Sequence, residues 1–292
     1  MELKLKEIIE ATGGRLAKGS AEALIKGVST DSRKIAVGEA FFALRGPSFD
    51  GHSFVRDVLF KGAAAAIVDK MESAQGLQPG ANIVLVDDAL SALGRLASYY
   101  RGLFNIPFVA VSGSAGKTTT KEMIAAILSR SRPVLKTEGN KNNLIGLPLT
   151  LFGLEKRHEA AVVELGISEF WEMERLTDIC RPDIAVLTNI GRGHLKTLGT
   201  LEGVAKAKGA LFAKLGPGGV RAVNLDDPWV VRLADKGGKA VTYSVKKDAD
   251  VRVRDYSVDE SFKGMSALYE VKGSLVPVRF STPALTNLLN GA

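Results

Sequence analysis

One stretch decides the fold class of this chain: Val109-Ala-Val-Ser-Gly-Ser-Ala-Gly-Lys-Thr-Thr-Thr120. The apolar run at 106–111 predicts a strand, and the residues after the second glycine predict a helix over 118–130. Glycines between a strand and a helix let backbone N–H groups turn toward phosphate oxygens, and the helix N-terminus adds partial positive charge. The stretch therefore predicts a phosphate-binding loop that consists of Gly113, Ser114, Ala115, Gly116, Lys117, Thr118 and Thr119.

Two side chains of this loop have predicted roles. Lys117 can reach the β- and γ-phosphates of ATP, and the Thr118 hydroxyl can ligate Mg²⁺. The longer form of the motif has a glycine where Val111 stands, so this chain carries the shorter pattern G-x-x-G-K-T. The alternative is a turn whose glycines serve geometry alone. The strand, two glycines, lysine and threonine triplet together favour nucleotide binding.

Apolar runs without alternation recur after the loop, and such runs are typical of parallel strands that are covered on both faces. Helical patterns separate them, which predicts an α/β protein with a mostly parallel, doubly wound sheet. The predicted strands are 160–164, 184–188 and 220–224, and the predicted helices are 170–180 and 200–215. Short β-like pieces between 240 and 280, such as VTYSV and VPVRF, predict an antiparallel extension.

A smaller α/β module is predicted at the start of the chain, and a helix at 89–103 links it to the sheet. Its predicted elements are helices at 3–12 and 54–61, a loop at 46–51, and strands at 39–44, 65–68 and 83–86. We therefore expect two domains, residues 1–86 and residues 87–292.

Composition restricts the class of protein further. The 292 residues include one cysteine, Cys180, so an intramolecular disulfide is excluded and a reducing, cytoplasmic location is expected. We expect no signal peptide and no membrane insertion, because every apolar run is far too short. The net charge of +7 comes from basic residues spread along the chain, which favours a phosphorylated small molecule over nucleic acid.

Two further polar residues are expected near the phosphate loop. Glu164 ends one predicted strand, and His194 follows the strand predicted at 184–188. The carboxyl ends of parallel strands share one edge of a sheet, so a carboxylate and an imidazole there predict a second contact to Mg²⁺. The alternatives are a helix cap or an ion pair for Glu164 and a loop histidine without a role for His194.

Lys208 has an unusual position in its predicted helix. It shares an apolar stripe with Val204, Leu211, Phe212 and Leu215. A snorkelling lysine that covers apolar surface and a partly buried lysine that serves the site both explain this pattern. The pattern alone leaves both interpretations open.

Several motifs together resemble the Mur ligase family, in the order in which that family carries them and over nearly all of the chain. The first module contains STDSR at 29–33, FFALRG at 41–46 and FDGHSF at 49–54. The rest of the chain contains GSAGKTTTKEM, TEGNKNNLIGLPLTL, ELG at Glu164, TNIGRGHL, AKAKG and NLDDP. The resemblance implies a first domain that binds a UDP-sugar, a central ATP-binding domain and a third, Rossmann-like domain that this chain lacks.

The resemblance also implies roles for single residues. Lys208 corresponds to the family lysine that becomes carbamylated and then ligates metal with Thr118, Glu164 and His194. Catalysis would depend on Lys117, His194 and Lys208, and Asn287 would lie near the adenine. The implied substrate-binding residues are Ser29, Thr30, Asp31, Ser32, Arg33, Arg45, Gly46, Asn140, Asn142 and Asn143. The asparagine cluster by itself is typical of a turn.

The GNKNNLIGLPLTL stretch is closest to family members that join D-alanyl-D-alanine to UDP-N-acetylmuramoyl-tripeptide. The resemblance thus implies a monomeric, ATP-dependent ligase of peptidoglycan precursor synthesis with these two substrates. The alternatives are a related Mur or folylpolyglutamate-type ligase with another acceptor, and a non-catalytic fragment that binds a nucleotide or a UDP-sugar. Ala115 and Ala210 depart from the family pattern, which has a polar residue and a glutamate there. The chain stops just inside a predicted helix, so we expect a truncation.

Overall fold

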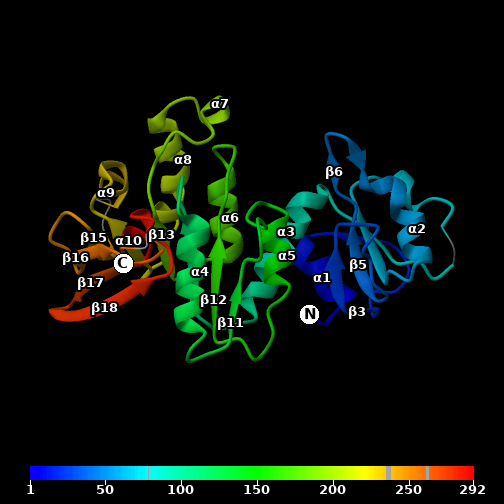
Figure 1. The fold of residues 1–292 in the computed structure, drawn as a ribbon. Helices are drawn as coiled ribbons and strands as arrows, with labels where there is room; N and C mark the ends of the chain where they lie inside the picture. Colours follow the sequence, from blue (N-terminus) through cyan, green and yellow to red (C-terminus); the bar gives the residue numbers. More distant parts are fainter. Residues whose placement is uncertain (78, 235–237, 261–262) are drawn as a thin grey trace. The chain divides into compact units, whose positions relative to one another are not determined.

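The computed structural model describes residues 1–77, 79–234, 238–260 and 263–292, and the few others, including 261–262 of the predicted extension, lie outside the described residues (Figure 1). Packing divides the chain into two compact units. Unit 1 consists of Met1–Asn105 and Leu144–Lys156, and unit 2 of Ile106–Asn143 and Arg157–Ala292. Both units combine a largely parallel sheet with helices, which confirms the predicted α/β class.

Unit 1 is built on a sheet in which four strands are parallel and the edge strand β2 is antiparallel to β9. The strands lie in the order β2 (Arg15–Lys18), β9 (Ile83–Leu85), β8 (Ala65–Val68), β5 (Glu39–Phe42) and β4 (Gly27–Ser29). All four residues of β8 are buried, because helices and loops cover both of its faces. The helices are α1 (Leu5–Thr12), α2 (Val55–Phe60), α3 (Ala89–Gly102) and α5 (Gly146–Leu151), with 3-10 turns η1 (Gly51–Phe54) and η2 (Met71–Ala74).

Two features of unit 1 differ from the predictions. Residues predicted as a loop at 46–51 contribute to a hairpin of β6 (Arg45–Gly46) and β7 (Phe49–Asp50), whose strands are too short to give a periodic signal. The helix predicted from residue 3 begins later, because β1 (Leu3–Lys4) pairs with β3 (Leu24–Ile25). The predicted domain boundary at residue 86 lies just before helix α3. This helix packs on α1 and α5, and it belongs to unit 1.

Unit 2 contains one long sheet. Its strands lie in the order β11 (Val134–Lys136), β12 (Ala160–Glu164), β10 (Phe108–Ser112), β13 (Ile184–Leu187), β14 (Val220–Asn224), β15 (Lys239–Ser244), β16 (Val251–Val258), β17 (Met265–Val271) and β18 (Ser274–Phe280). Neighbours from β11 to β16 are parallel, and β17 and β18 are antiparallel.

The prediction of antiparallel strands is confirmed for VPVRF, which lies in β18, because β18 is antiparallel to β17. It is wrong for VTYSV, whose first four residues lie in β15. Strand β15 is parallel to β14 because helix α9 (Pro228–Ala234), which the sequence analysis missed, joins them as a crossover. A crossover helix returns the chain to the same end of the sheet, so the next strand runs in the same direction.

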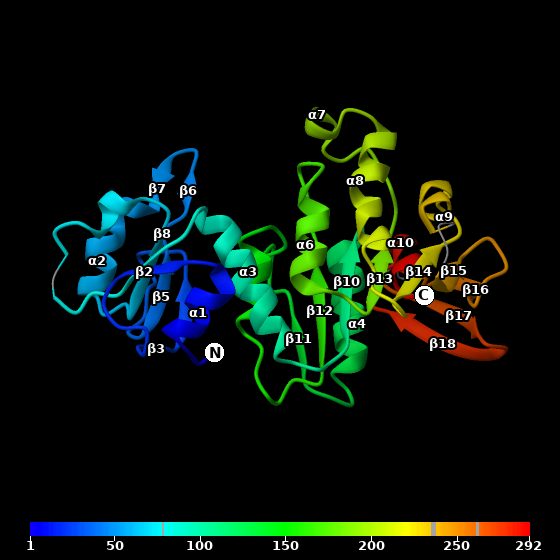
Figure 2. The ribbon, with the colours of Figure 1, turned by 180° about the vertical axis from the view of Figure 1, so that it is seen from behind.

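Helices cover both faces of the sheet of unit 2, as Figures 1 and 2 show from opposite sides. Helix α4 (Lys117–Leu128) packs on β10, β11 and β12, whereas α6 (Glu172–Cys180) and α8 (Leu201–Ala213) lie on the other face. Right-handed crossovers place these helices on opposite faces. After β10 the chain moves toward the β11 edge of the sheet, and after β12 it moves toward the opposite edge. The carboxyl ends of β10, β12 and β13 consequently meet at one edge, where an open α/β sheet binds its ligands.

The two remaining helices of unit 2 are short: α7 (Leu195–Leu198) and α10 (Thr286–Asn290). None of the helices in the described residues has the length and apolar character that a transmembrane helix needs.

Candidate functional site

The predicted phosphate loop follows β10, and two glycines determine its shape. Gly113 has φ 146° and Gly116 has φ 80°, values that residues with a Cβ rarely adopt. A Cβ on Gly113 would lie 2.0 Å from Oγ1 of Thr188. The first turn of α4 then presents the amides of Lys117, Thr118 and Thr119, because such amides have no acceptor within their own helix. These amides and the helix N-terminus form a site suited to an anion.

Residues 188–191 hold the loop in this shape. The Ala115 N–H donates to Asn189 Oδ1, and Asn189 Nδ2 donates to the Ala115 carbonyl, both at 3.0 Å. The Thr188 hydroxyl donates to the same carbonyl at 2.5 Å, and the Gly191 N–H donates to Ser114 Oγ at 2.8 Å. In the stretch that begins with the TNIG motif, only His194 was predicted as a site residue. Thr188, Asn189 and Gly191 of this motif prove to be partners of the loop.

Three of the predicted residues meet at the end of β12. Glu164 is 2% exposed. Its Oε2 accepts from the Thr118 hydroxyl at 2.9 Å, and its Oε1 accepts from Asn142 Nδ2 at 2.8 Å. Lys117 lies nearby on the loop, where its Nζ donates to the Gly113 carbonyl at 3.0 Å. A carboxylate, a hydroxyl and an amide are oxygen donors that a hard cation such as Mg²⁺ prefers.

Three further predicted residues, His194, Asn140 and Asn143, are exposed to solvent. His194 is exposed, with φ 58° at the residue before α7, and its side chain contacts none of the described residues through a hydrogen bond or an ion pair. Asn140 and Asn143 are exposed, and the Asn140 carbonyl closes a turn with the Asn142 N–H at 2.8 Å. Within the described residues, no group of three or more His, Cys, Asp and Glu side chains is arranged to hold a metal ion.

Lys208 is buried, with 1% of its surface exposed, among the stripe residues Val204, Leu211 and Phe212. The burial excludes the snorkelling interpretation, because a snorkelling lysine would be exposed, and a role of Lys208 at the site stays a prediction. Its amine has no hydrogen-bond or ion-pair partner in the described part of the chain. Burial, with a smaller contribution from the charge of Lys117, lowers the pKa of Lys208 from 10.5 to about 8. A larger fraction of this amine is therefore neutral at pH 7 than in an ordinary lysine.

A pocket of about 200 Å³ opens beside the phosphate loop. It brings the predicted Asn287 together with loop residues and with two side chains that the sequence analysis did not predict, Tyr243 and Asn290. Burial raises the pKa of the Tyr243 hydroxyl above its ordinary value, and the carboxylates of Asp227 and Asp226 add to this shift. The lining residues are Ala115, Gly116, Thr119, Thr188, Asn189, Tyr243, Thr286, Asn287, Leu289 and Asn290.

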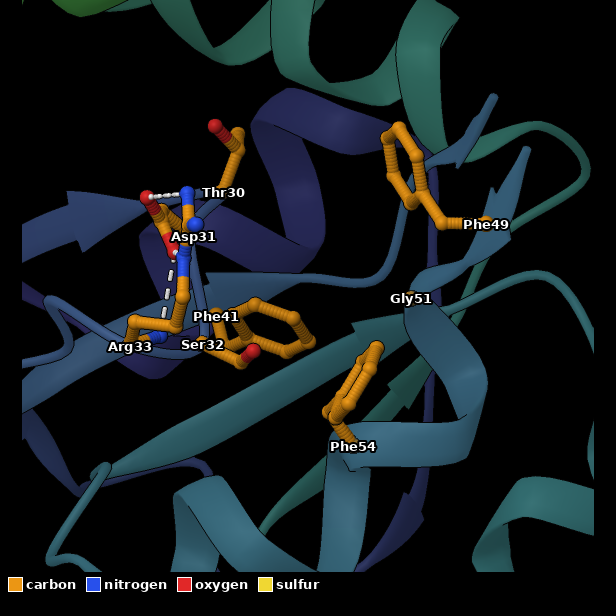
Figure 3. A pocket seen from close by; sticks show the side chains of 8 residues that line it. All are labelled: Thr30, Asp31, Ser32, Arg33, Phe41, Phe49, Gly51 and Phe54. Atoms are coloured by element: carbon orange, nitrogen blue, oxygen red, sulfur yellow. Dashed lines mark hydrogen bonds and ion pairs between the residues drawn. The ribbon is translucent and has the colours of Figure 1, made fainter. Parts of the chain in front are cut away.

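Unit 1 contains a larger pocket, of about 480 Å³. Figure 3 shows the turn at 30–33 on one side, Phe49 and Phe54 on the other, and Phe41 between them. Arg33 donates to both carboxylate oxygens of Asp31, at 2.9 and 2.8 Å, and these bonds hold the pKa of Asp31 well below its ordinary value. The pocket is lined by Thr30, Asp31, Ser32, Arg33, Phe41, Phe49, Gly51 and Phe54.

This lining includes four predicted residues, Thr30 to Arg33, and omits three others. Ser29, Arg45 and Gly46 are absent from the described lining residues. Arg45 forms an ion pair with Asp69 at 2.6 Å, and Gly46 pairs with Phe49 across the hairpin. The three phenylalanines belong to motifs that were quoted for the family resemblance but were not singled out as site residues.

Two family models match the chain. The Mur ligase middle domain matches residues 111–292, and the catalytic domain of the Mur ligase family matches residues 24–101. The chain belongs to the Mur ligase family. The family resemblance that the motifs indicated is therefore confirmed.

Two curated relatives of this Mur ligase chain are named UDP-N-acetylmuramoyl-tripeptide--D-alanyl-D-alanine ligase. The protein of Bacillus subtilis is 39% identical over 257 residues, which are 88% of this chain and 55% of the relative. That of Synechocystis sp. is 39% identical over 229 residues, 78% of this chain and 50% of the relative. The chain spans about half the length of the curated relatives it matches.

Solved structures of the family share the fold of this Mur ligase chain. MurF from Acinetobacter baumannii matches with a TM-score of 0.91 and 31% identity, over 99% of this chain and 63% of that one. MurF ligase from Thermotoga maritima in complex with ADP matches with a TM-score of 0.82 and 31% identity, over 90% of this chain and 60% of that one.

Proposed function

We propose that this chain is the part of a Mur ligase that binds ATP and a UDP-sugar, in a protein that joins D-alanyl-D-alanine to UDP-N-acetylmuramoyl-tripeptide during peptidoglycan precursor synthesis. The observation that carries the proposal is the phosphate loop, whose Thr118 lies against Glu164 at the ligand-binding edge of the sheet. The names of the Bacillus subtilis and Synechocystis relatives support the choice of substrates, and the ADP complex of the Thermotoga maritima protein supports an adenine nucleotide.

The proposed reaction has two steps. The carboxylate of the UDP-muramoyl peptide attacks the γ-phosphorus of ATP, ADP leaves, and an acyl phosphate forms. The amine of D-alanyl-D-alanine then attacks the acyl carbon, phosphate leaves with the bonding electrons, and an amide remains after the amine loses a proton. Residues at the site would act by orienting the phosphoryl group and by stabilising its charge, since phosphoryl transfer needs little covalent chemistry from a protein.

In this proposal the phosphates bind to the amides of the loop Gly113, Ser114, Ala115, Gly116, Lys117, Thr118 and Thr119. The Lys117 ammonium neutralises charge on the β- and γ-phosphates, which it would reach by leaving the Gly113 carbonyl. The pocket that contains Asn287 receives the adenine, because it opens beside the loop.

The donor set at Glu164 fits Mg²⁺. Thr118 and Glu164 would hold it, and it would neutralise charge on the phosphate oxygens. We further propose His194 and a carbamylated Lys208 as ligands. Two features support the carbamate. The amine of Lys208 has no partner among the described residues, and its lowered pKa leaves more of the neutral amine, whose nitrogen attacks the carbon of carbon dioxide and then loses a proton.

The pocket in unit 1 is proposed to hold the uridine part of the substrate. Three aromatic rings suit a flat base, and the turn at 30–33 supplies polar groups beside them. Ser29, Arg45 and Gly46, together with Asn140, Asn142 and Asn143, stay in the proposal as residues that contact other parts of the substrate. The two proposed domains, 1–86 for the UDP-sugar and 87–292 for ATP, a cytoplasmic location and a monomeric state also remain proposals.

The test is nucleotide binding by this chain, measured by calorimetry with ADP and Mg²⁺. We expect the chain to bind, and Lys117→Ala to bind at least about tenfold more weakly, because a charge-assisted contact to phosphate is lost. Lys206→Ala is the matched control, since Lys206 is exposed on the same unit. Absence of any binding by the unchanged chain would refute the proposal. Phosphate release by the longer protein with D-alanyl-D-alanine, single amino acids or glutamate as acceptor then separates the alternatives.

A further inference from the structure

A second buried lysine lies one turn beyond the phosphate loop. Lys121, on α4, is 0% exposed. A buried ammonium destabilises a fold unless partners replace its water. Its Nζ donates to the Thr137 carbonyl at 2.6 Å and forms an ion pair with Glu122 Oε1 at 2.7 Å. The proposed nucleotide site assigns no role to Lys121.

The partner of Lys121 is in turn bonded to Glu164. Thr137 is 0% exposed, and its Oγ1 accepts from the Glu164 N–H at 3.0 Å. The Thr137 N–H donates to the Val162 carbonyl at 3.1 Å, which ties it to β12 a second time. A continuous series of hydrogen bonds therefore runs from Lys121 through Thr137 to the backbone of Glu164, whose carboxylate contacts Thr118 at the other end of the same helical turn.

The simpler interpretation is that Lys121 has a purely structural role and only holds helix α4 against strand β11. A half-buried pair already does this, because Glu122 on α4 also pairs with Lys136 on β11 at 2.6 Å, without full burial of a charge. What Lys121 adds is the bond to Thr137, the residue that fixes the Glu164 amide. The geometry thus assigns to the buried charge a task that Lys136 does not perform.

We propose that Lys121 is a positioning residue. Through Thr137 it fixes the backbone at Glu164 and so holds the carboxylate beside Thr118, where the metal-bound nucleotide binds. This inference rests on the proposed function. Residues that orient a metal ligand typically change metal affinity about 10- to 100-fold when they are replaced.

The experiment compares Lys121→Met with Lys136→Met. Both variants lose a partner of Glu122, but only the first loses the bond to Thr137. Binding of ADP is measured by calorimetry with Mg²⁺ and with EDTA, and the melting temperature of each variant is recorded. For Lys121→Met we expect an affinity about 10- to 100-fold weaker with Mg²⁺, and an affinity within about twofold of the original with EDTA. Lys136→Met should match the unchanged chain in both conditions.

The inference would be overturned if Lys121→Met lost equal affinity for ADP with Mg²⁺ and with EDTA, or if both variants lost the same affinity. Lys121 would then only hold α4 against β11. If the unchanged chain gains nothing from Mg²⁺, the proposed function fails and the inference with it, so the two failures are distinguishable.

Thr137→Val and Thr137→Ser provide a second comparison that keeps Lys121 in place. Valine preserves the shape and the carbonyl that Lys121 uses but removes the acceptor of the Glu164 N–H, whereas serine preserves the hydroxyl. We expect the Mg²⁺-specific loss in Thr137→Val and its absence in Thr137→Ser. Binding of ADP with Mg²⁺ by Thr137→Val at the original affinity would overturn the inference.

Discussion

Replacement of Lys208 by methionine is expected to stabilise unit 2. The lysine is 1% exposed among apolar side chains, and its amine has no hydrogen-bond or ion-pair partner in the described part of the chain. Methionine has a similar length and no charge, so it removes the desolvation of the ammonium without leaving a cavity. We expect this gain although Lys208 is proposed to act in the reaction, because functional residues are often retained at the expense of stability.

The magnitude follows from the pKa of Lys208. Its fall from 10.5 to about 8 corresponds to a loss of about 3 kcal/mol at pH 7, at about 1.4 kcal/mol per pH unit. Below the folded-state pKa both states hold the proton, and the folded state bears the whole penalty. Between the two values the folded state releases its proton first, so the free energy of unfolding rises with pH. By pH 10 the penalty has fallen below about 1 kcal/mol.

The assay is urea unfolding at pH 7 and pH 10, followed by tryptophan fluorescence. Both tryptophans of the chain, Trp171 and Trp229, lie in unit 2, so the signal reports that unit. Buffers free of bicarbonate keep the amine unmodified. We expect Lys208→Met to exceed the unchanged chain by up to about 3 kcal/mol at pH 7 and by less than about 1 kcal/mol at pH 10. Lys206→Met, at an exposed position of the same helix, should change stability by less than about 0.5 kcal/mol at either pH.

Two results would refute the reasoning. A destabilised Lys208→Met at pH 7 would mean that the ammonium has a stabilising partner. A difference between variant and unchanged chain that is the same at both pH values would mean that the buried amine does not titrate in this range.

Three further predictions concern single side chains. Gly113→Ala should destabilise unit 2 by at least about 2 kcal/mol in the same unfolding assay, because the new Cβ would lie 2.0 Å from Thr188 Oγ1 at φ 146°; a change within about 0.5 kcal/mol would contradict this. Asp50 accepts a hydrogen bond from Lys70, and this bond together with His52 holds the pKa of Asp50 below its ordinary value of 3.8. The stabilisation of the folded state by Asp50 is therefore fully present above pH 3.8 and is lost as the pH falls through the lowered pKa. The difference in stability between Asp50→Asn and the unchanged chain, followed by circular dichroism, should therefore shrink between about pH 5 and pH 2, and a constant difference would oppose the argument. Phe54→Ala should weaken binding of UDP to the pocket in unit 1 about tenfold in calorimetry, since a ring that contacts the base is lost; an unchanged affinity would exclude that pocket as the uridine site.

The sequence alone determined the parts of this protein that depend on neighbouring residues. Strands β12 and β14 have the predicted bounds, and the loop between β10 and α4 lies where its glycines predicted it. Apolar runs and turn glycines act over a few residues, so they can be read without the fold. The shared edge of parallel strands also follows from their direction, which is why Glu164 was expected near the loop.

Only the tertiary structure decided which distant groups meet. Asn189 holds Ala115 across the sheet, Phe49 and Phe54 face the turn at 30–33, and Lys121 is bonded through Thr137 to Glu164, although no periodic pattern links these positions. The burial of Lys208 was undecided for the same reason, because neighbours from other elements determine whether a stripe lysine reaches water. The direction of β15 depended on a crossover helix and not on the strand itself. Hydrogen bonds and burial of this kind arise from residues far apart in the chain, and local sequence carries little record of them.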